Sequence, residues 1–388
     1  MKILLIVGTA NDVFIYNFAK WLKLKMKGIF IDVFEFFPSK SQGYDNEYYD
    51  NLITVNQSSC VRKNKYLNKL FYSFYAAREL DVFLKNNNYD IVHCHWIVPP
   101  VVLSKALLKC KAKKYLTFWG REYINFKILF SQKIFKWRLD KLINSVDYII
   151  NSKVFFETIF KKMYPNFKGG CLFGRLGSAS LEFIYDIFDV NTKNDVKEKL
   201  GINCDKYSVL IGYSGKVLHQ HIEIIKNLEK EDLLKSKIHL LVPMTRGSSK
   251  SYIEVVENAL LNSGFSYTLI KGRYLSDKEI AELRIATDIV LQLSTTDGFS
   301  RSIVECLCAK SLMIYGEWLN YDNYLDLENF WALKASSIED AVLILQGVIY
   351  KYEEYTCYLE TNAKNGKMQN LWSFCINDWI EAYKKAIK

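Results

Sequence analysis

Two carboxylates, Asp297 and Glu305, are the residues of this chain best placed to do chemistry. They lie eight residues apart in the stretch 294–305, which reads STTDGFSRSIVE. An apolar, β-branched run at 288–293 precedes this stretch and is typical of a buried parallel strand. Residues 301–309 then carry apolar side chains at helical spacing. The sequence therefore predicts a strand, a short polar turn and the beginning of a helix.

The predicted turn has the properties of an anion site. A helix that begins there presents free backbone N–H groups and the positive end of its dipole, and both stabilise a bound phosphate. Asp297 and Glu305 flank this point just over two helical turns apart, a spacing that sets one carboxylate at each end of a bound nucleotide sugar. The residues expected to line the site are Gly298, Phe299, Ser300, Arg301 and Ser302.

This stretch resembles the acidic motif of retaining glycosyltransferases with two facing Rossmann-like domains, notably glycosyltransferase family 4. In that motif a Glu, then Gly-Phe-Gly, then a second Glu eight positions after the first bind the donor sugar and its nucleotide. Here Asp297 stands for the first Glu and Ser300 for the third-position Gly. The resemblance implies that Asp297 holds the sugar hydroxyls and Glu305 the ribose hydroxyls.

A basic residue is expected where the second half of the chain begins its strand–helix alternation. Residues 208–213 predict a strand, and Gly215 and Lys216 follow in a turn. In the resembled family this turn carries a basic residue that meets the donor diphosphate, a role that Lys216 matches. A second basic residue normally follows six positions later, where this chain has Ile222. The candidates for the missing cation are His219, His221 and Arg246, although Arg246 is equally explained as a surface loop charge.

The first half of the chain offers a second set of candidate ligand contacts. Gly8 and Thr9 form a small-residue turn after a predicted strand at 2–7, where a ligand can approach the backbone. This turn lacks Gly-x-Gly-x-x-Gly, so a dinucleotide cofactor is not supported. Predicted strands at 89–96 and 114–118 resemble the Asp-Ile-x-His-x-His and Thr-x-x-Gly marks of the same glycosyltransferases.

At the second of these marks Trp119 precedes Gly120, whereas many relatives carry His at the position of Trp119. We therefore expect His95 to supply a polar contact to the donor, the alternative for His93 and His95 being hydrogen-bonded packing. A metal is not expected there, because Cys94 faces away from both histidines on a strand. No Asp-x-Asp occurs in the chain either.

The resemblance and the alternation of elements together predict an α/β fold of the GT-B type. Two Rossmann-like domains would face each other across a cleft, with a C-terminal helix crossing back to the first domain. We expect residues 1–170 to bind the acceptor, 171–370 to bind the nucleotide sugar, and 371–388 to form that helix. The glycine-rich segment 167–180 is the expected linker.

Composition and charge limit the cellular context. Half of the residues are hydrophobic and no apolar run reaches eighteen residues, so we expect a folded protein without a transmembrane helix. Nine irregularly spaced cysteines indicate reduced thiols in the cytoplasm. Residues 1–170 contain 27 Lys and Arg against 13 Asp and Glu, while the remainder contain 25 against 29. This asymmetry predicts peripheral contact of the first half with an anionic membrane or a lipid-diphosphate acceptor rather than nucleic acid, the alternative being a solvated lysine-rich surface.

The implied activity is retaining transfer of a sugar from a nucleotide-diphosphate sugar to a glycan or polyprenyl-diphosphate-linked acceptor. It would serve bacterial surface polysaccharide assembly at the inner face of the membrane and need no metal or cofactor beyond the donor. Trp119-Gly-x-x-Tyr123 and the loop at 241–247 also resemble transferases of deoxy-amino sugars that act on lipid-linked intermediates. A nucleotide-sugar 2-epimerase and a catalytically silent glycosyltransferase-like partner subunit are the competing hypotheses.

Overall fold

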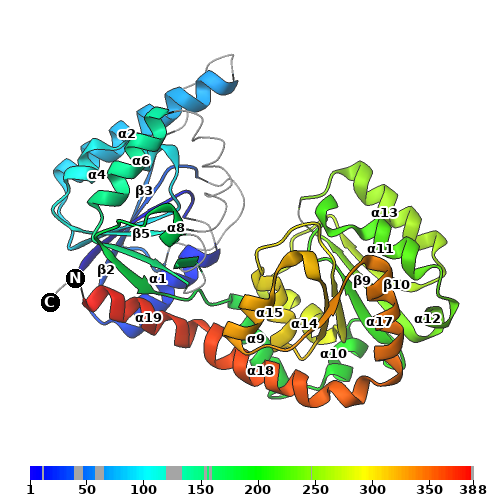
Figure 1. Cartoon of the computed structure of the whole chain (residues 1–388). Helices are drawn as coiled ribbons and strands as arrows, with labels where there is room; N and C mark the ends of the chain where they lie inside the picture. Colours follow the sequence, from blue (N-terminus) through cyan, green and yellow to red (C-terminus); the bar gives the residue numbers. More distant parts are fainter. Residues whose placement is uncertain are drawn as a thin grey trace. The chain divides into compact units, whose positions relative to one another are not determined.

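The computed structural model describes residues 1–10, 13–38, 47–56, 65–118, 133–152, 155–156, 160–245 and 247–385. These residues form two compact units (Figure 1). The first unit comprises Met1–Gly177 together with Trp372–Lys388, and the second comprises Ser178–Leu371. In the described part of the chain, no helix is both long and apolar enough to span a bilayer.

The first unit is built on a seven-stranded parallel sheet in the order β3-β2-β1-β4-β5-β6-β7. Leu5 of β1 pairs with Val33 of β2 on one side and with His93 of β4 on the other. The chain order reverses between β1 and β4, which is the point at which open α/β sheets bind ligands at their carboxyl edge. The strands are β1 (Lys2–Val7), β2 (Phe30–Glu35), β3 (Asn51–Thr54), β4 (Ile91–His95), β5 (Lys113–Thr117), β6 (Tyr148–Asn151) and β7 (Gly170–Phe173).

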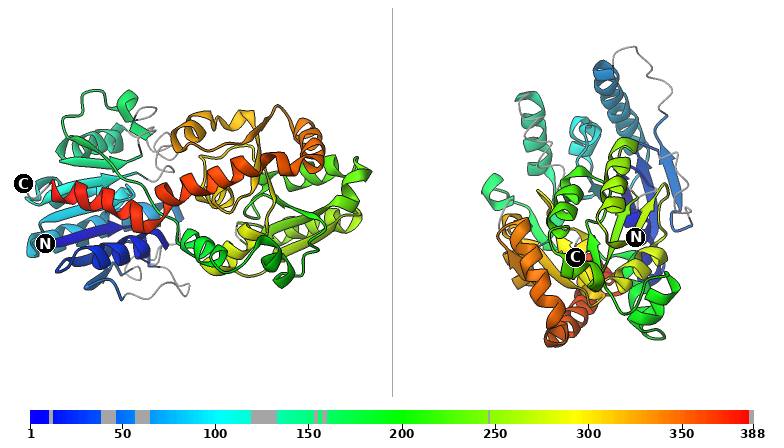
Figure 2. Two further views of the ribbon diagram at one scale, coloured as in Figure 1. Left: turned by 90° about the horizontal axis from the view of Figure 1, so that it is seen from below. Right: turned by 90° about the vertical axis from the view of Figure 1, so that its right-hand side faces the viewer.

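Helices cover both faces of this sheet because its strands alternate their side chains between two cores. Leu4 and Ile6 of β1 pack in a core with α2, α3, α4 and α6, whereas Ile3 and Leu5 pack in a core with α1 and α19. Helices α1 and α19 lie side by side (Figures 1 and 2). The helices are α1 (Val13–Lys25), α2 (Lys65–Asn86), α3 (Pro99–Leu103), α4 (Lys105–Lys109), α6 (Lys133–Ser145), α8 (Lys161–Met163) and α19 (Trp372–Lys384).

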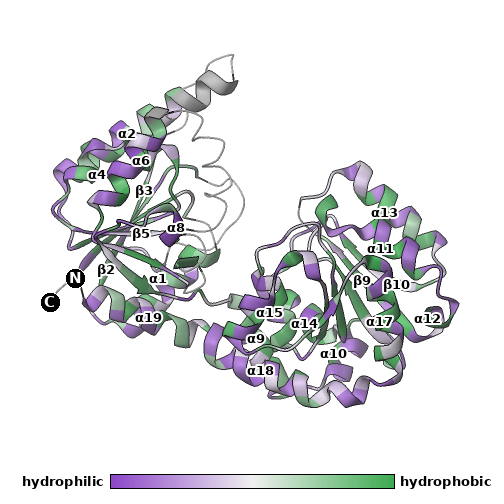
Figure 3. Ribbon diagram, in the orientation of Figure 1, coloured by the Kyte–Doolittle hydropathy of each residue, from purple (hydrophilic) through white to green (hydrophobic). Residues whose placement is uncertain are grey.

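The second unit repeats this plan with a six-stranded parallel sheet in the order β10-β9-β8-β11-β12-β13. Its strands are mainly hydrophobic (Figure 3), since both faces are covered by helices. The strands are β8 (Tyr207–Ile211), β9 (Ile238–Met244), β10 (Ser266–Lys271), β11 (Ile289–Gln292), β12 (Leu312–Gly316) and β13 (Leu333–Ala335).

Two layers of helices sandwich the second sheet. One layer packs α11, α13 and α17 on a core shared with β8 and β9, and the other packs α9, α14 and α15. The helices are α9 (Ala179–Phe188), α10 (Lys193–Lys199), η3 (Val217–His219), α11 (His221–Leu228), α12 (Asp232–Lys237), α13 (Lys250–Asn262), α14 (Asp277–Ala286), α15 (Arg301–Cys308), η4 (Glu317–Leu319), α16 (Asp322–Glu328), α17 (Ile338–Tyr350), η5 (Tyr352–Tyr355) and α18 (Thr356–Asn370).

The expected linker, segment 167–180, contains the division between the two units, which falls between Gly177 and Ser178. Its central part is the strand β7, which pairs with β6. Gly169 and Gly170 permit this pairing: a Cβ on Gly169 would lie 2.8 Å from the carbonyl oxygen of Asp147, and a Cβ on Gly170 would lie 2.6 Å from the Tyr148 ring. These glycines therefore serve close packing at a sheet edge, which composition alone does not distinguish from flexibility.

Candidate functional site

The predicted acidic turn lies between the end of β11 and the beginning of α15. Its Asp297 carboxylate accepts three hydrogen bonds. Tyr213 donates its hydroxyl to Oδ1 at 2.5 Å, the Ser300 backbone N–H donates to Oδ2 at 3.0 Å, and the Tyr321 hydroxyl also donates to Oδ2. A carboxylate offers about four acceptor positions, so three of them are occupied inside the unit. Asp297 is therefore held by two tyrosines and in turn holds the backbone of the turn.

The direction of these hydrogen bonds is fixed by their neighbours. The side-chain amide of Gln292 donates to the Tyr321 oxygen at 2.8 Å, so the Tyr321 proton is left to point at Asp297. Burial raises the pKa of both Tyr213 and Tyr321, and the Asp297 charge raises them further. Both phenols thus remain protonated donors at every physiological pH.

Phe299 completes the turn with a backbone conformation that bulky residues rarely adopt. Its φ is 58°, in the left-handed region. The ring stacks on Tyr324 with centroids 5.3 Å apart and meets Tyr321 edge-on at 5.0 Å. A strained residue that its surroundings hold in place is typical of functional turns. On its other side Gly298 is exposed, and a Cβ there would meet nothing within 4 Å.

The turn after β8 is joined directly to the acidic turn. The Thr295 N–H donates to the Leu218 carbonyl at 2.8 Å. His219 bridges the same two turns, since its Nε2 lies 2.8 Å from Ser214 Oγ and its Nδ1 lies 2.7 Å from Ser294 Oγ. The structure therefore brings the predicted Gly215 and Lys216 turn and the predicted acidic turn together at the carboxyl edge of one sheet.

Burial disfavours His219 and His221 as the second cation. Burial lowers the pKa of His219 to about 3, helped by the nearby His221 and Lys216, and burial lowers the pKa of His221 to about 4. Both rings are consequently neutral at pH 7. The remaining candidate, Arg246, lies outside the described residues.

Lys216 is the cation that the two turns leave available. Within the described ranges its ammonium group makes no hydrogen bond or ion pair, and the side chain is half-buried. Its alkyl chain runs past Gly247, which has a φ of 72°. A Cβ on Gly247 would lie 2.8 Å from Lys216 Cγ and 3.2 Å from its Cε. Gly247, in the loop after β9, therefore leaves the space that the Lys216 side chain occupies.

Glu305, in contrast, is buried in the interior of the second unit, where both of its oxygens accept hydrogen bonds. It is 7% exposed, and it accepts a hydrogen bond from the Ser178 hydroxyl at 2.6 Å. Its other oxygen accepts from Arg284 Nε at 3.3 Å, and Arg284 is 4% exposed. Asp297 and Glu305 share none of these partners. This geometry supports a buried ion pair more directly than the expected contact with ribose.

The start of α15 retains an anion-binding character of its own. The Arg301 guanidinium donates to the Asn370 side chain, so its direction is set by the end of α18. The backbone N–H groups of Arg301 and Ser302 lie in the first helical turn, where a helix supplies no acceptor. At this turn the groups open to an anion are therefore these amides rather than the Arg301 side chain.

The candidates in the first unit fall into two groups. His93 and His95 are fully buried in the core beside Phe18 and Trp379. His93 Nδ1 lies 2.5 Å from the hydroxyl of Tyr383 on α19, and burial lowers the pKa of His95 to about 3. This placement favours packing over a ligand contact for both rings. Trp119 and Gly120 lie outside the described residues.

Gly8 and Thr9 lie at the carboxyl edge of the first sheet, as predicted. The Thr9 hydroxyl is buried and has no hydrogen-bond partner among the described residues. A Cβ on Gly8 would lie 3.9 Å from the ring of Trp96. Trp96 has a φ of 65°, a strained conformation that marks this edge as a second functional candidate.

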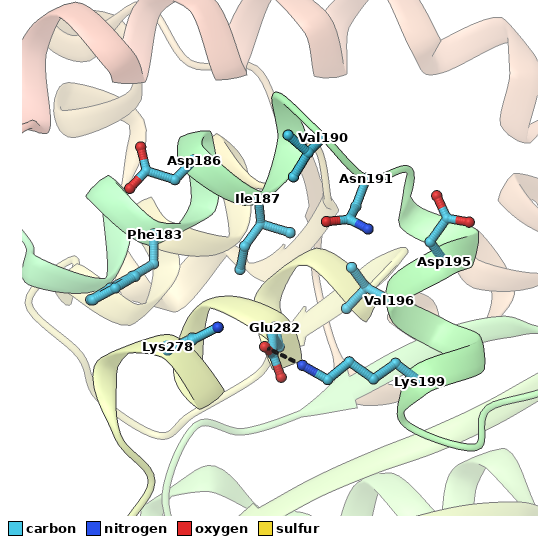
Figure 4. Close-up of a pocket in the computed structure, with 10 residues that line it drawn as sticks. All are labelled: Phe183, Asp186, Ile187, Val190, Asn191, Asp195, Val196, Lys199, Lys278 and Glu282. Carbon is cyan, nitrogen blue, oxygen red and sulfur yellow. Dashed lines mark hydrogen bonds and ion pairs between the residues drawn. The ribbon is translucent and has the colours of Figure 1, made fainter.

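A pocket in the second unit contains none of the predicted site residues (Figure 4). It has a volume of about 420 Å³ and lies between α9, α10 and α14. Lys199 and Glu282 form an ion pair at 2.7 Å across it, and Val190 on its rim is 80% exposed. Over the described ranges, no group of His, Cys, Asp and Glu side chains is arranged to hold a metal ion.

Comparison with known proteins identifies the class to which this architecture belongs. Residues 2–152 match the family model described as glycosyl transferase 4-like. No curated protein matches the chain by sequence. Sucrose-phosphate synthase from Thermosynechococcus elongatus is similar in structure, with a TM-score of 0.74 at 12% identity over 100% of this chain and 99% of that one.

Two further solved structures cover 99% of this chain. WaaG, a glycosyltransferase involved in lipopolysaccharide biosynthesis, has a TM-score of 0.68 at 13% identity over 99% of its own length. Anabaena Alr3699/HepE, solved in complex with UDP and glucose, has a TM-score of 0.65 at 12% identity over 100% of its length. The chain therefore has the GT-B fold, and its residues 2–152 are similar to the glycosyl transferase 4-like family. The predicted fold class is confirmed.

Sequence reasoning missed two residues that organise the site, Tyr213 and Tyr321, and the role of a third, His219. Tyr213 lies two residues after the end of the buried strand β8, and that position was a usable signal. Tyr321 donates to Asp297 from a separate loop, and no local sequence pattern predicts this contact. His219 was considered only as a cation, whereas the structure uses it as a neutral bridge between two turns.

Proposed function

We propose that this protein is a retaining glycosyltransferase. It moves a sugar from a nucleotide-diphosphate sugar to a glycan or polyprenyl-diphosphate-linked acceptor during assembly of a bacterial surface polysaccharide. The observation that carries the proposal is Lys216, a cation without a partner among the described residues, in the turn after β8 that hydrogen bonds join to the acidic turn before α15. Such a combination neutralises a diphosphate.

The comparisons support the choice of donor and setting. One similar structure contains UDP and glucose, and another is a glycosyltransferase involved in lipopolysaccharide biosynthesis. The basic first half of the chain suits an anionic partner, so we include peripheral contact with the inner face of the membrane. Within this proposal, the second unit binds the donor and the first unit binds the acceptor.

The reaction breaks the bond between the sugar C1 and the oxygen of the diphosphate. The acceptor hydroxyl forms a new bond to C1 on the same face, and its proton passes to the departing phosphate oxygen. The transition state resembles an oxocarbenium ion, and negative charge grows on the leaving group. Lys216 and the first-turn amides of α15 stabilise that charge, which is the largest electrostatic contribution required. The scheme uses no metal ion and no cofactor other than the donor.

Asp297 has a different part from the one that the family motif implies. Three of its acceptor positions are occupied by Tyr213, Tyr321 and the Ser300 amide. At most one position remains for a sugar hydroxyl. Its main role is therefore positioning: it fixes the turn whose amides meet the donor. Glu305 of α15 helps to hold that helix in place through its buried ion pair with Arg284 of α14.

A donor-hydrolysis experiment tests this function. The protein is incubated with UDP-, GDP-, CMP- and dTDP-sugars, including deoxy-amino sugars, and the released sugar is followed by proton NMR. We expect one donor to release its sugar first in the anomeric configuration that it had in the donor. Release of the opposite anomer would contradict retention. No release from any donor, in the presence or absence of lipid-linked acceptor extracts, would favour the silent partner subunit.

A further inference from the structure

Helix α2 presents a stripe of exposed apolar and basic side chains. Phe74, Arg78, Val82 and Lys85 follow one another at spacings of four, four and three residues, so they share one face of the helix. Phe74 is 54% exposed and Val82 is 48% exposed. The opposite face, with Ala76 and Leu80, is buried in the core under the helix. Apolar side chains and cations are thus mixed on the outer face.

Helix α6 repeats this arrangement on the same side of the sheet. Trp137 is 55% exposed, and the ammonium of Lys141, one turn later, lies 3.8 Å from the centre of its ring. Helices α2 and α6 flank α3 and α4, and all four pack in the same core. Between them Lys105 and Lys109 of α4 are also exposed. In Figure 3 both α2 and α6 combine hydrophobic and hydrophilic residues.

The nearest acidic groups do not cancel these cations. The Asp81 carboxylate of α2 accepts hydrogen bonds from the Ser104 hydroxyl at 2.6 Å and from the Ala106 N–H at 2.8 Å, so it is turned toward the beginning of α4. Asp140 of α6 interacts with the Tyr164 hydroxyl and raises its pKa, after the larger effect of burial. The third acidic residue of these helices, Glu79 of α2, is half-buried beside Arg78, so the five exposed cations outnumber the acidic side chains of the outer face.

We propose that this outer face of α2, α4 and α6 is a docking surface for an anionic lipid bilayer. Bulky apolar side chains beside lysines are the combination that inserts at the boundary between headgroups and acyl chains. Tryptophan and lysine both suit that boundary, because each joins an apolar body to a polar end. Five exposed cations attract anionic headgroups: Arg78, Lys85, Lys105, Lys109 and Lys141.

The inference deepens the proposed function and rests on it in one respect, namely that a lipid-linked acceptor lies at a membrane. It adds the surface that reaches the membrane, which the charge of the whole first half does not specify. A protein partner is the competing explanation for exposed apolar residues. The row of lysines between the apolar side chains favours the bilayer, because interface cores are depleted in lysine.

Co-sedimentation with vesicles tests the surface directly. The full chain is mixed with vesicles of phosphatidylcholine containing about a third phosphatidylglycerol, and with vesicles of pure phosphatidylcholine. We expect binding to the first only, weakened by high salt. The double variant Lys85→Glu with Lys141→Glu should bind at least about 25-fold more weakly, since each cation near the bilayer contributes about fivefold. The double variant Phe74→Ser with Trp137→Ser should also lose most of its binding.

A matched control uses equally exposed apolar residues elsewhere. Val255 and Leu261 on α13 are 53% and 64% exposed, and Val255→Ser with Leu261→Ser should bind vesicles like the wild type. Failure of the wild type to bind anionic vesicles at low salt would overturn the inference, as would equal loss in the control variant. A change in oligomeric state without a change in vesicle binding would identify a protein interface instead. Donor hydrolysis in vesicle-free buffer is measured separately, so failure here leaves the proposed function intact.

Discussion

The hydroxyl of Tyr213 donates to Asp297 Oδ1 at 2.5 Å, which ties the end of β8 to the acidic turn after β11. These are neighbouring strands, and Asp297 is the only carboxylate of the motif that lies in the turn itself. Under the proposed function, this contact makes Asp297 a positioning residue rather than a direct ligand of the donor. Donor binding should therefore respond to the tyrosines that hold Asp297.

The hydroxyls of Tyr213 and Tyr321 form a clamp on Asp297. Removing either hydroxyl should loosen the acidic turn. We expect Tyr213→Phe and Tyr321→Phe each to lower the free energy of unfolding by roughly 1.5–3 kcal/mol, because a hydrogen bond to a charged group is lost. Both should also weaken donor binding. Urea unfolding and donor titration provide the measurements. Tyr350→Phe, whose ring is 66% exposed, is the control and should behave like the wild type. Donor affinity unchanged in both clamp variants would refute the positioning role of Asp297.

Gly247→Ala should weaken donor binding through Lys216. The new methyl group would occupy space 2.8 Å from Lys216 Cγ, so the lysine must leave its path past the glycine. Gly272→Ala is a matched control: Gly272 has a φ of 78°, close to the 72° of Gly247, but a Cβ there meets nothing within 4 Å. Both variants should lose about 1 kcal/mol of stability through backbone strain. Only Gly247→Ala should lose donor affinity, by about tenfold, as measured by calorimetric titration.

Glu305→Ala should lower the free energy of unfolding more directly than it affects donor binding. It leaves Arg284 charged and uncompensated at 4% exposure, which costs roughly 3–5 kcal/mol. Glu360→Ala, which removes an exposed ion pair with Lys310, is the comparison and should cost under about 1 kcal/mol. Thermal and urea unfolding give both values. A Glu305→Ala protein as stable as the wild type, but unable to bind donor, would restore the ribose role.

Mild acid should destabilise the fold through its buried histidines. Burial depresses the pKa of each ring below its ordinary value of 6.5, to about 3 for His219 and about 4 for His221 and His239. Below pH 6.5 the unfolded chain therefore binds more protons than the folded one. The free energy of unfolding therefore has its full value above pH 6.5. It falls as the pH drops toward 4, by up to ~1.4 kcal/mol per ring and pH unit. The same direction applies to His93 and His95.

Urea unfolding at several pH values measures this effect. His239→Gln should reduce the slope of stability against pH by about one proton, because it removes one of the rings. A free energy of unfolding that stays constant between pH 6.5 and 5 would show that these rings are accessible to protons in the folded protein.

The sequence was sufficient for features that depend on neighbouring residues. Hydrophobic runs located β8 and β11, and α14 begins at a capping box in which Ser276 and Glu279 make both reciprocal hydrogen bonds. The polar turn after β11 was predicted for the same reason. Periodicity and capping are local properties, and the tertiary fold did not override them.

Contacts between distant segments could not be predicted in this way. His95 is buried partly by Trp379 of α19, which comes from the other end of the chain. Glu305 finds Ser178 127 residues earlier, and Tyr321 reaches Asp297 from a loop 24 residues later. The roles of these carboxylates depend on which partners the fold supplies, and spacing within the motif contains no information about them.

The most direct test of the donor site is thermal unfolding with a panel of nucleotide sugars, for the wild type and Lys216→Met. A ligand at about a hundred times its dissociation constant stabilises the protein by ~2.7 kcal/mol, a shift of a few degrees. Lys226→Met, an exposed lysine on α11, is the control. We predict that one nucleotide sugar shifts the wild type and the control but barely shifts Lys216→Met. No shift with any nucleotide at millimolar concentration, or equal shifts in all three proteins, would contradict a donor site built on Lys216.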